Sequence, residues 1–185
     1  MSWKRFTPLV GAATVLALVA IVPALAATFG PPASKSPPTS VEHVYTQHVL
    51  LTGQAEKPRG ELDGSGGVTI CINKDTNTVS FNFDALLVRG QPTVAHIEKG
   101  AVGVAGPVAV GFTQPGMIDP TIGEIEWNDT VPASASTVTA LIGTPKNFYV
   151  NVHTKAYPSG AVRGQLAGWK KLTLQEGVAD ECSAG

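Results

Sequence analysis

Charged residues are few in this sequence, and neither sign is in clear excess. Lysine, arginine, aspartate and glutamate make up 15% of the 185 residues, and the formal net charge at pH 7 is -1. A protein that binds nucleic acid needs a basic surface to neutralise phosphates. We therefore expect no nucleic acid among the partners of this chain.

Motifs for nucleophilic catalysis are also missing. The sequence contains no Gly-x-Ser-x-Gly elbow, the motif that exposes the nucleophile in many serine hydrolases. No other complete catalytic set is evident along the chain. We therefore expect a protein that is not an enzyme.

A long uncharged run is present at the N-terminus, over residues 6–33, after the basic pair Lys4-Arg5. Its apolar stretch LVGAATVLALVAIVPAL leads into a small-x-small pattern at 24–26, which is typical of a signal-peptidase site. The pattern predicts a cleaved signal peptide over residues 1–26 and a secreted, periplasmic or cell-envelope location. An uncleaved anchor is the alternative, because residues 9–27 are long enough to cross a bilayer. Cleavage would remove two positive charges from a net charge of -1, leaving -3 and no transmembrane segment.

Cysteine is almost absent, since the chain has only Cys71 and Cys182. In an exported protein such a pair predicts a disulfide, and two free thiols are the alternative. The bond would close a loop of about 110 residues, for which the chain-entropy model gives about 4–5 kcal/mol of stability. It would attach the C-terminal tail to the strand that contains Cys71.

Composition and hydrophobic periodicity divide the rest of the chain. Residues 27–43 are rich in proline and serine and predict a linker. Residues 44–170 alternate between apolar and polar side chains in short runs, with one near-helical stretch at 134–145, and residues 171–185 form a polar tail. We expect an all-β domain, a Greek-key β-sandwich or barrel of about eight antiparallel strands with one short helix.

Two segments carry unusual polar residues. In AHIEKGAVGVAGPV (95–108), strand parity places His96 and Glu98 on one face. In YVNVHTKAYPSGAVRGQL (149–166), it places Tyr149, Asn151 and His153 on one face, while Arg163 and Gln165 share a face of the return strand. The glycines at 100, 103 and 106 predict either a tight crossover or a loop that accepts a ligand.

These two segments resemble the signature segments of the chordin-domain (CHRD) family. LTGQAEKP (51–58), DGSGGVTICIN (63–73) and FNFDALL (81–87) are similar to other parts of the same domain, and the resemblance covers roughly residues 44–169. It implies an extracellular β-rich domain with a fold similar to that of copper/zinc superoxide dismutase. The family usually has His-x-His where this chain has His96-Ile97-Glu98.

A metal site is one interpretation of the polar residues. His96, Glu98 and His153 would hold a single zinc or copper ion if the two signature strands are neighbours, with the His-Glu pair suiting zinc better than copper. A copper/zinc superoxide dismutase needs about six histidines by family resemblance. The chain has four histidines, which excludes that enzyme.

A structural polar cluster is the other interpretation. Buried polar groups must find hydrogen-bond partners, and a satisfied network helps to specify one arrangement of strands. We expect Arg163 to pair with Glu98 or Glu56 in this case. The expected members are Glu56, Asn151, His153, Arg163 and Gln165.

For function, we expect a non-enzymatic extracellular module, with no cofactor, that binds a protein, a glycan or a component of the cell envelope. Its binding face would lie on the loops at 98–106, 113–122 and 155–160, because contact surfaces vary most on loops held by a rigid scaffold. The alternative is a metalloprotein with one zinc or copper site.

Overall fold

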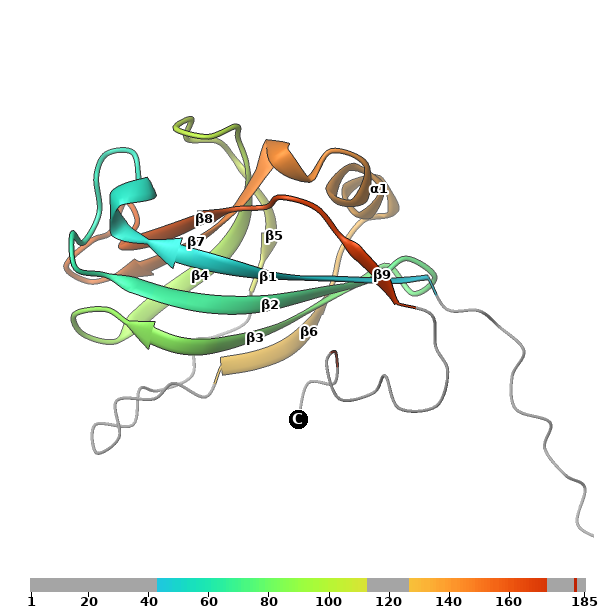
Figure 1. Ribbon diagram of the computed structural model, residues 1–185, viewed down its shortest axis with the longest axis horizontal. Coiled ribbons are helices and arrows are strands. Elements are labelled where there is room, and N and C mark those ends of the chain that lie inside the picture. Colours follow the sequence, from blue (N-terminus) through green and yellow to red (C-terminus); the bar gives the residue numbers. More distant parts are fainter. Residues whose placement is uncertain (1–42, 113–126, 173–181, 183–185) are drawn as a thin grey trace, which may run out of the picture. The chain divides into compact units, whose positions relative to one another are not determined.

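Figure 1 shows the computed structural model of the chain, which describes residues 43–112, 127–172 and 182. Nine strands, one α-helix and two 3-10 turns make up this part of the chain. The strands are β1 (Val44–Thr52), β2 (Ser65–Asn73), β3 (Thr78–Leu87), β4 (Pro92–Lys99), β5 (Val108–Gly111), β6 (Trp127–Pro132), β7 (Phe148–Thr154), β8 (Val162–Gln165) and β9 (Lys170–Leu172). The helix is α1 (Ala135–Gly143), and the turns are η1 (Gly53–Ala55) and η2 (Pro145–Asn147).

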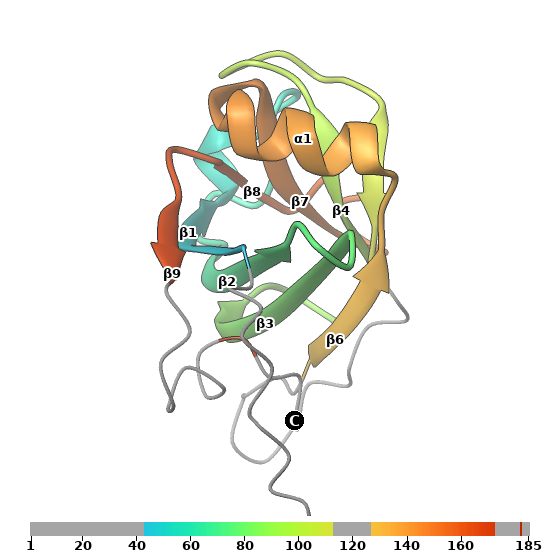
Figure 2. The same ribbon diagram turned by 90° about the vertical axis from the view of Figure 1, so that its right-hand side faces the viewer.

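The strands form one antiparallel sheet in the order β5-β4-β7-β8-β1-β2-β3-β6, with β9 beside β1. This sheet curls into a nearly closed barrel (Figure 2), with β5 and β6 at the two ends of the strand order. The predicted all-β, antiparallel barrel fold with one short helix is confirmed. The ninth strand, β9, includes two residues that the sequence pattern assigns to the tail, and three residues are too few to show a period of two.

Alternating side chains of the strands fill the barrel. Val150 and Val152 of β7 point into this core, and both are fully buried. Phe81 stacks on Phe112 with ring centroids 4.1 Å apart, and Phe83 stacks on Trp127 at 4.6 Å. Offset stacking adds to the burial of large apolar area, so these rings hold β3, β5 and β6 together.

Helix α1 begins where the sequence predicts it. The hydroxyl of Ser134 accepts a hydrogen bond from the amide of Thr137, which satisfies one of the free N–H groups at the helix start. Val138 and Leu141 are buried in the barrel core. The indole of Trp169 donates to the Leu141 carbonyl and so attaches the segment before β9 to the helix.

The predicted disulfide is present between Cys71 of β2 and Cys182, with their Cα atoms 5.6 Å apart. It links positions 111 residues apart and holds Cys182 against β2. The predicted signal peptide, almost all of the linker and the loop at 113–122 lie outside the described residues. Within the described part of the chain, no helix has the length and apolarity to cross a membrane.

Candidate metal centre

The polar site lies on the outer face of three neighbouring strands. β4 pairs with β7 so that His96 faces Asn151 and Glu98 faces Tyr149. β7 pairs with β8 so that Asn151 also faces Arg163. Because cross-strand partners lie on the same side of a sheet, this register brings the two signature segments together on one face.

Most of that outer face is covered. Tyr149 is 1% exposed, Arg163 2% and Asn151 3%. The loop between β4 and β5 covers one part of it, and the segment between β1 and β2 covers another, where the amide of Glu61 donates to the Ala161 carbonyl. β7 is therefore buried on both faces, and its polar side chains must find partners in the protein.

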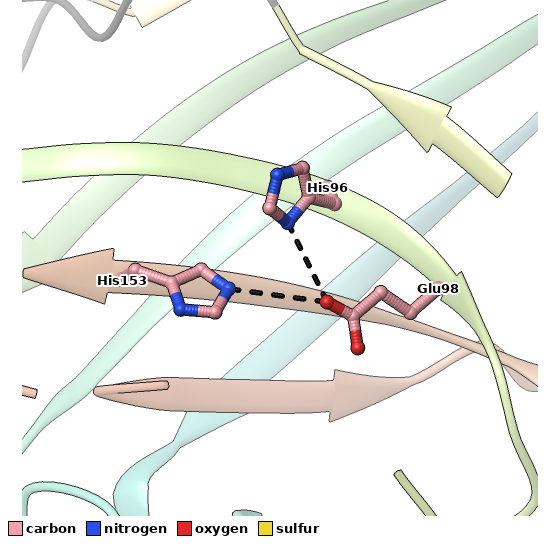
Figure 3. Close-up of side chains that lie close together, drawn as sticks. All are labelled: His96, Glu98 and His153. Carbon is pink, nitrogen blue, oxygen red and sulfur yellow. Dashed lines mark ion pairs between the residues drawn. The ribbon is translucent and has the colours of Figure 1, made fainter. Parts of the chain in front are cut away.

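Three potential metal ligands converge in this site (Figure 3). The Nδ1 atom of His96 lies 3.5 Å from Oε1 of Glu98, and the Nε2 atom of His153 lies 3.9 Å from the same oxygen. The three ligand atoms all lie within 4.8 Å of one another. Ligands about 2.1 Å from a tetrahedral zinc ion are roughly 3.4 Å apart, so the spacing is close to that of a zinc site.

The two ring nitrogens are buried, and neither has a hydrogen-bond partner among the described residues. Buried polar atoms are nearly always paired, so two orphaned nitrogens aimed at one carboxylate need an explanation. An ion bonded to both nitrogens and to Glu98 supplies one. The donor set of two imidazoles and a carboxylate also suits zinc, with a fourth position left open.

Hydrogen bonds with neighbouring groups orient His153 and Glu98. The Nδ1 atom of His153 donates to the carbonyl of Pro158 at 3.0 Å, which leaves the lone pair of the neutral ring on Nε2, facing Glu98. The hydroxyl of Tyr149 donates to Oε2 of Glu98 and accepts from the amide of Gly106. Such outer partners are typical of metal sites, where they set the tautomer and the orientation of the ligands.

Electrostatics keep Glu98 ionised. Burial alone would raise the pKa of this carboxyl, but the imidazoles of His153 and His96 and the Tyr149 hydroxyl outweigh it and hold the pKa far below its ordinary value. The same carboxylate raises the pKa of His153. Burial, with Glu98 next to it, raises the pKa of Tyr149 to about 12, so the phenol stays protonated and remains a donor.

Arg163 does not make the ion pair that the sequence suggested with Glu98 or Glu56. Its guanidinium instead donates to the carbonyls of Val104 and Ala101, at 3.0 and 2.9 Å. Its Cζ atom lies 3.3 Å from the centre of the Tyr149 ring. A planar fork can span two carbonyls and stack on an aromatic face at once, and this geometry uses both properties.

Gln165 completes the attachment of the β4–β5 loop. Its amide nitrogen lies within 2.9 Å of the carbonyls of Gly100, Lys146 and Phe148. A Cβ atom at Gly106 would collide with the Lys99 carbonyl, and Gly103 has a φ of +76°. The glycines therefore form a tight crossover that folds back onto the barrel, the first of the two alternatives for this loop.

Glu56 lies apart from the three ligands, against Asn151 and Gly160. It is 1% exposed, and its Oε1 atom and the Oδ1 atom of Asn151 both lack a partner among the described residues. A Cβ atom at Gly160 would lie 2.6 Å from that Glu56 oxygen and 2.8 Å from the Asn151 oxygen. Burial raises the pKa of Glu56 to about 7, against a smaller opposing effect of Arg163. A protonated Glu56 can donate to Asn151, which satisfies both groups.

The remaining histidines take no part in the site. His43 pairs with Asp75 at 3.1 Å and His48 with Asp84 at 3.2 Å, and all four side chains are well exposed to solvent. Two partners of the site were missed from the sequence. The Pro158 carbonyl gives no side-chain signal, whereas Tyr149 shares the parity of Asn151 and His153 and could have been included.

Fold and site together define a small antiparallel barrel with a buried polar cluster on its outer face and no assembled catalytic set among the described residues. The chain belongs to the CHRD family: the model of the CHRD domain matches residues 48–166, which include all of the polar cluster described above. CHRD domains are typically extracellular, and the CHRD domain is not a known enzyme family. Neither a curated protein nor a solved structure matches the chain.

Proposed function

We propose that this CHRD protein is an exported, non-enzymatic binding domain that holds one zinc ion at His96, Glu98 and His153. Three observations support export: the apolar N-terminal run, the disulfide, and the typically extracellular location of CHRD domains. The observation that carries the metal assignment is the pair of buried, unpartnered ring nitrogens that face one ionised carboxylate. Copper is a less suitable ion, because an oxygen ligand replaces one of the soft or nitrogen ligands that copper prefers.

The ion would have a structural or buffering role in this proposal. The ligands come from two adjacent strands, and Glu98 is connected through Tyr149 to the amide of Gly106 in the β4–β5 loop. An ion that bonds to Glu98 would therefore stabilise β4, β7 and that loop together. Binding to the folded state alone raises stability in proportion to the logarithm of the free zinc concentration.

The decisive experiment measures zinc binding to the exported protein by calorimetric titration after removal of metal with a chelator. We expect close to one equivalent of zinc for the wild type, and binding at least about tenfold weaker for His96→Ala and for Glu98→Gln. His48→Ala is the matched control, because it removes an imidazole outside the site. Binding should also strengthen as the pH rises above 6.5, since zinc must displace the proton held by His153.

Circular dichroism of each variant separates loss of ligand from loss of fold. Glu98→Gln preserves the size of the side chain, so it keeps the test valid if His96→Ala fails to fold. Binding of less than about a tenth of an equivalent by the folded wild type would refute the proposal.

A further inference from the structure

The loop between β4 and β5 exposes only apolar side chains. Residues 100–108 read GAVGVAGPV and contain no side chain able to form a hydrogen bond. Val102 is 79% exposed, and Val104 and Val108 are 53% exposed. Figure 1 shows this loop, in yellow-green, rising above the barrel. Exposed apolar side chains gathered on one loop mark a surface that contacts another phase or molecule.

Several backbone groups of this loop are already paired inside the protein. Arg163 donates hydrogen bonds to the carbonyls of Ala101 and Val104, and Gln165 donates to the carbonyl of Gly100. The Pro107 carbonyl accepts from the amide of Lys99, and the amides of Gly100, Val104 and Gly106 donate to protein oxygens. Unpaired backbone groups are what exclude most loops from a lipid environment, since each costs several kcal/mol there. Part of that cost is removed here.

Three exposed lysines lie near this loop. The Cε atom of Lys57 would lie 3.9 Å from a Cβ atom at Gly103. Lys99 is exposed directly before the loop, and it also lines a groove of about 310 Å³ that continues from Val108 towards α1. Lys146 is exposed, and the Gln165 amide that donates to the Gly100 carbonyl also donates to the Lys146 carbonyl. The nearest acidic groups along these strands, Glu98 and Glu56, are buried beneath.

We propose that this apolar loop, with Lys57, Lys99 and Lys146 around it, docks onto an anionic lipid surface. Val102 and Val104 insert at the boundary between headgroups and acyl chains, and the lysines contact the negative headgroups. Apolar area and basic charge together are the two components of such interfacial binding. A protein partner fits less well, because the loop offers no polar side chains to specify one. The inference goes beyond the zinc site and does not depend on it.

The test places an environment-sensitive dye on the loop of the exported protein. Both native cysteines are in the disulfide, so Val102→Cys provides a single reactive thiol. The readout comes from the loop itself, so a retained N-terminal apolar segment would not produce the signal. Lys74→Cys, in the turn between β2 and β3, carries the dye in the control. The probes are vesicles of phosphatidylglycerol with phosphatidylcholine, and vesicles of phosphatidylcholine alone.

We expect blue-shifted, brighter emission from the Val102 dye with anionic vesicles, little change with neutral vesicles, and no change from the Lys74 dye. Replacing the three lysines by glutamine should raise the lipid concentration needed for half-maximal binding by about tenfold or more, as should high salt. In the unlabelled protein, Val102→Asp with Val104→Asp should abolish sedimentation with anionic vesicles, whereas Leu87→Asp, an exposed apolar residue at the end of β3, should not. An unchanged Val102 dye at saturating anionic lipid would overturn the proposal, and so would an equal response to neutral vesicles.

Discussion

At the residue scale, Tyr149 connects the candidate metal ligands to the loop above them. Its hydroxyl donates to Glu98 and accepts from the Gly106 amide. The Arg163 guanidinium stacks over its ring. A single phenol oxygen therefore satisfies two buried groups. Removing it leaves both unpaired.

Tyr149→Phe tests this connection. We expect the free energy of unfolding to fall by about 1–3 kcal/mol, because a buried carboxylate oxygen and a buried amide lose their partner. Zinc affinity should fall by about tenfold, since Glu98 is less firmly oriented. Tyr45→Phe, on β1, is the control. Urea unfolding and zinc titration check the two effects, and unchanged values for both would show that the hydroxyl does not connect these groups.

Glu56 gives a prediction about pH. Its folded pKa of about 7 lies above the ordinary value of 4.5, so the folded state binds this proton more tightly than the unfolded chain does. Its contribution is therefore complete below pH 4.5 and is lost as the pH rises through about 7, a loss on the order of 2–3 kcal/mol. Glu56→Gln mimics the protonated form and should flatten stability over this range.

His153 and Glu98 also titrate, and they set the limits of the pH range in which the folded state is most stable. His153 has a raised pKa, so its contribution is complete below 6.5 and is lost at higher pH. Glu98 has a lowered pKa, so its contribution is present above 4.5 and is lost as the solution becomes more acidic. Unfolding experiments in chelator should find greatest stability at mildly acidic pH. A Glu56→Gln variant with the same pH profile as the wild type would contradict the assignment.

At the element scale, β8 holds the β4–β5 loop through two side chains that lie two positions apart on the strand. Arg163 and Gln165 both point outward and reach carbonyls of residues 100–104, about sixty positions away in the sequence. The loop has no apolar anchor of its own in the core, since its valines face solvent. Its conformation therefore depends on these hydrogen bonds.

Arg163→Ala should release this loop. We expect faster hydrogen exchange at the Val104 and Gly106 amides and a loss of about 1–3 kcal/mol in the free energy of unfolding. Arg163→Lys should restore little of it, because one ammonium group cannot span two carbonyls and stack on Tyr149. Arg59→Ala, at an exposed position, is the control. An unchanged melting temperature and exchange rate in Arg163→Ala would refute this role.

At the scale of the whole molecule, the disulfide joins β2 to a residue near the end of the chain, 111 positions away. In the chain-entropy model, a loop of that length stabilises the folded state by about 4–5 kcal/mol. The double variant Cys71→Ser/Cys182→Ser should therefore unfold at a markedly lower urea concentration. Reduction of the wild type should give the same midpoint as the variant, and equal midpoints for the oxidised wild type and the variant would contradict the prediction.

Much of the architecture follows from local patterns. Alternation predicted about eight short strands, the near-helical stretch at 134–145 predicted α1, and the two-cysteine count predicted the disulfide. Parity also placed Tyr149, Asn151 and His153 together on one face of β7. β9 was not predicted, because three residues are too few to show a period of two. The predicted partners of Arg163 were wrong, because its charge suggests an ion pair with a carboxylate, whereas the structure has it donating to backbone carbonyls.

The sequence by itself determined the strands, the faces of their side chains and the family, since these depend on spacing along the chain. Only the tertiary structure decided that β4 and β7 are neighbours in the register that brings His96, Glu98 and His153 together. It also decided that the outer face of β7 is buried, because the covering loops pack against it from distant parts of the chain. Because they are buried, those polar residues form a site with two unpaired histidine nitrogens and a Glu56 whose pKa is raised, rather than a solvated strand face. The same packing holds the apolar β4–β5 loop above the site.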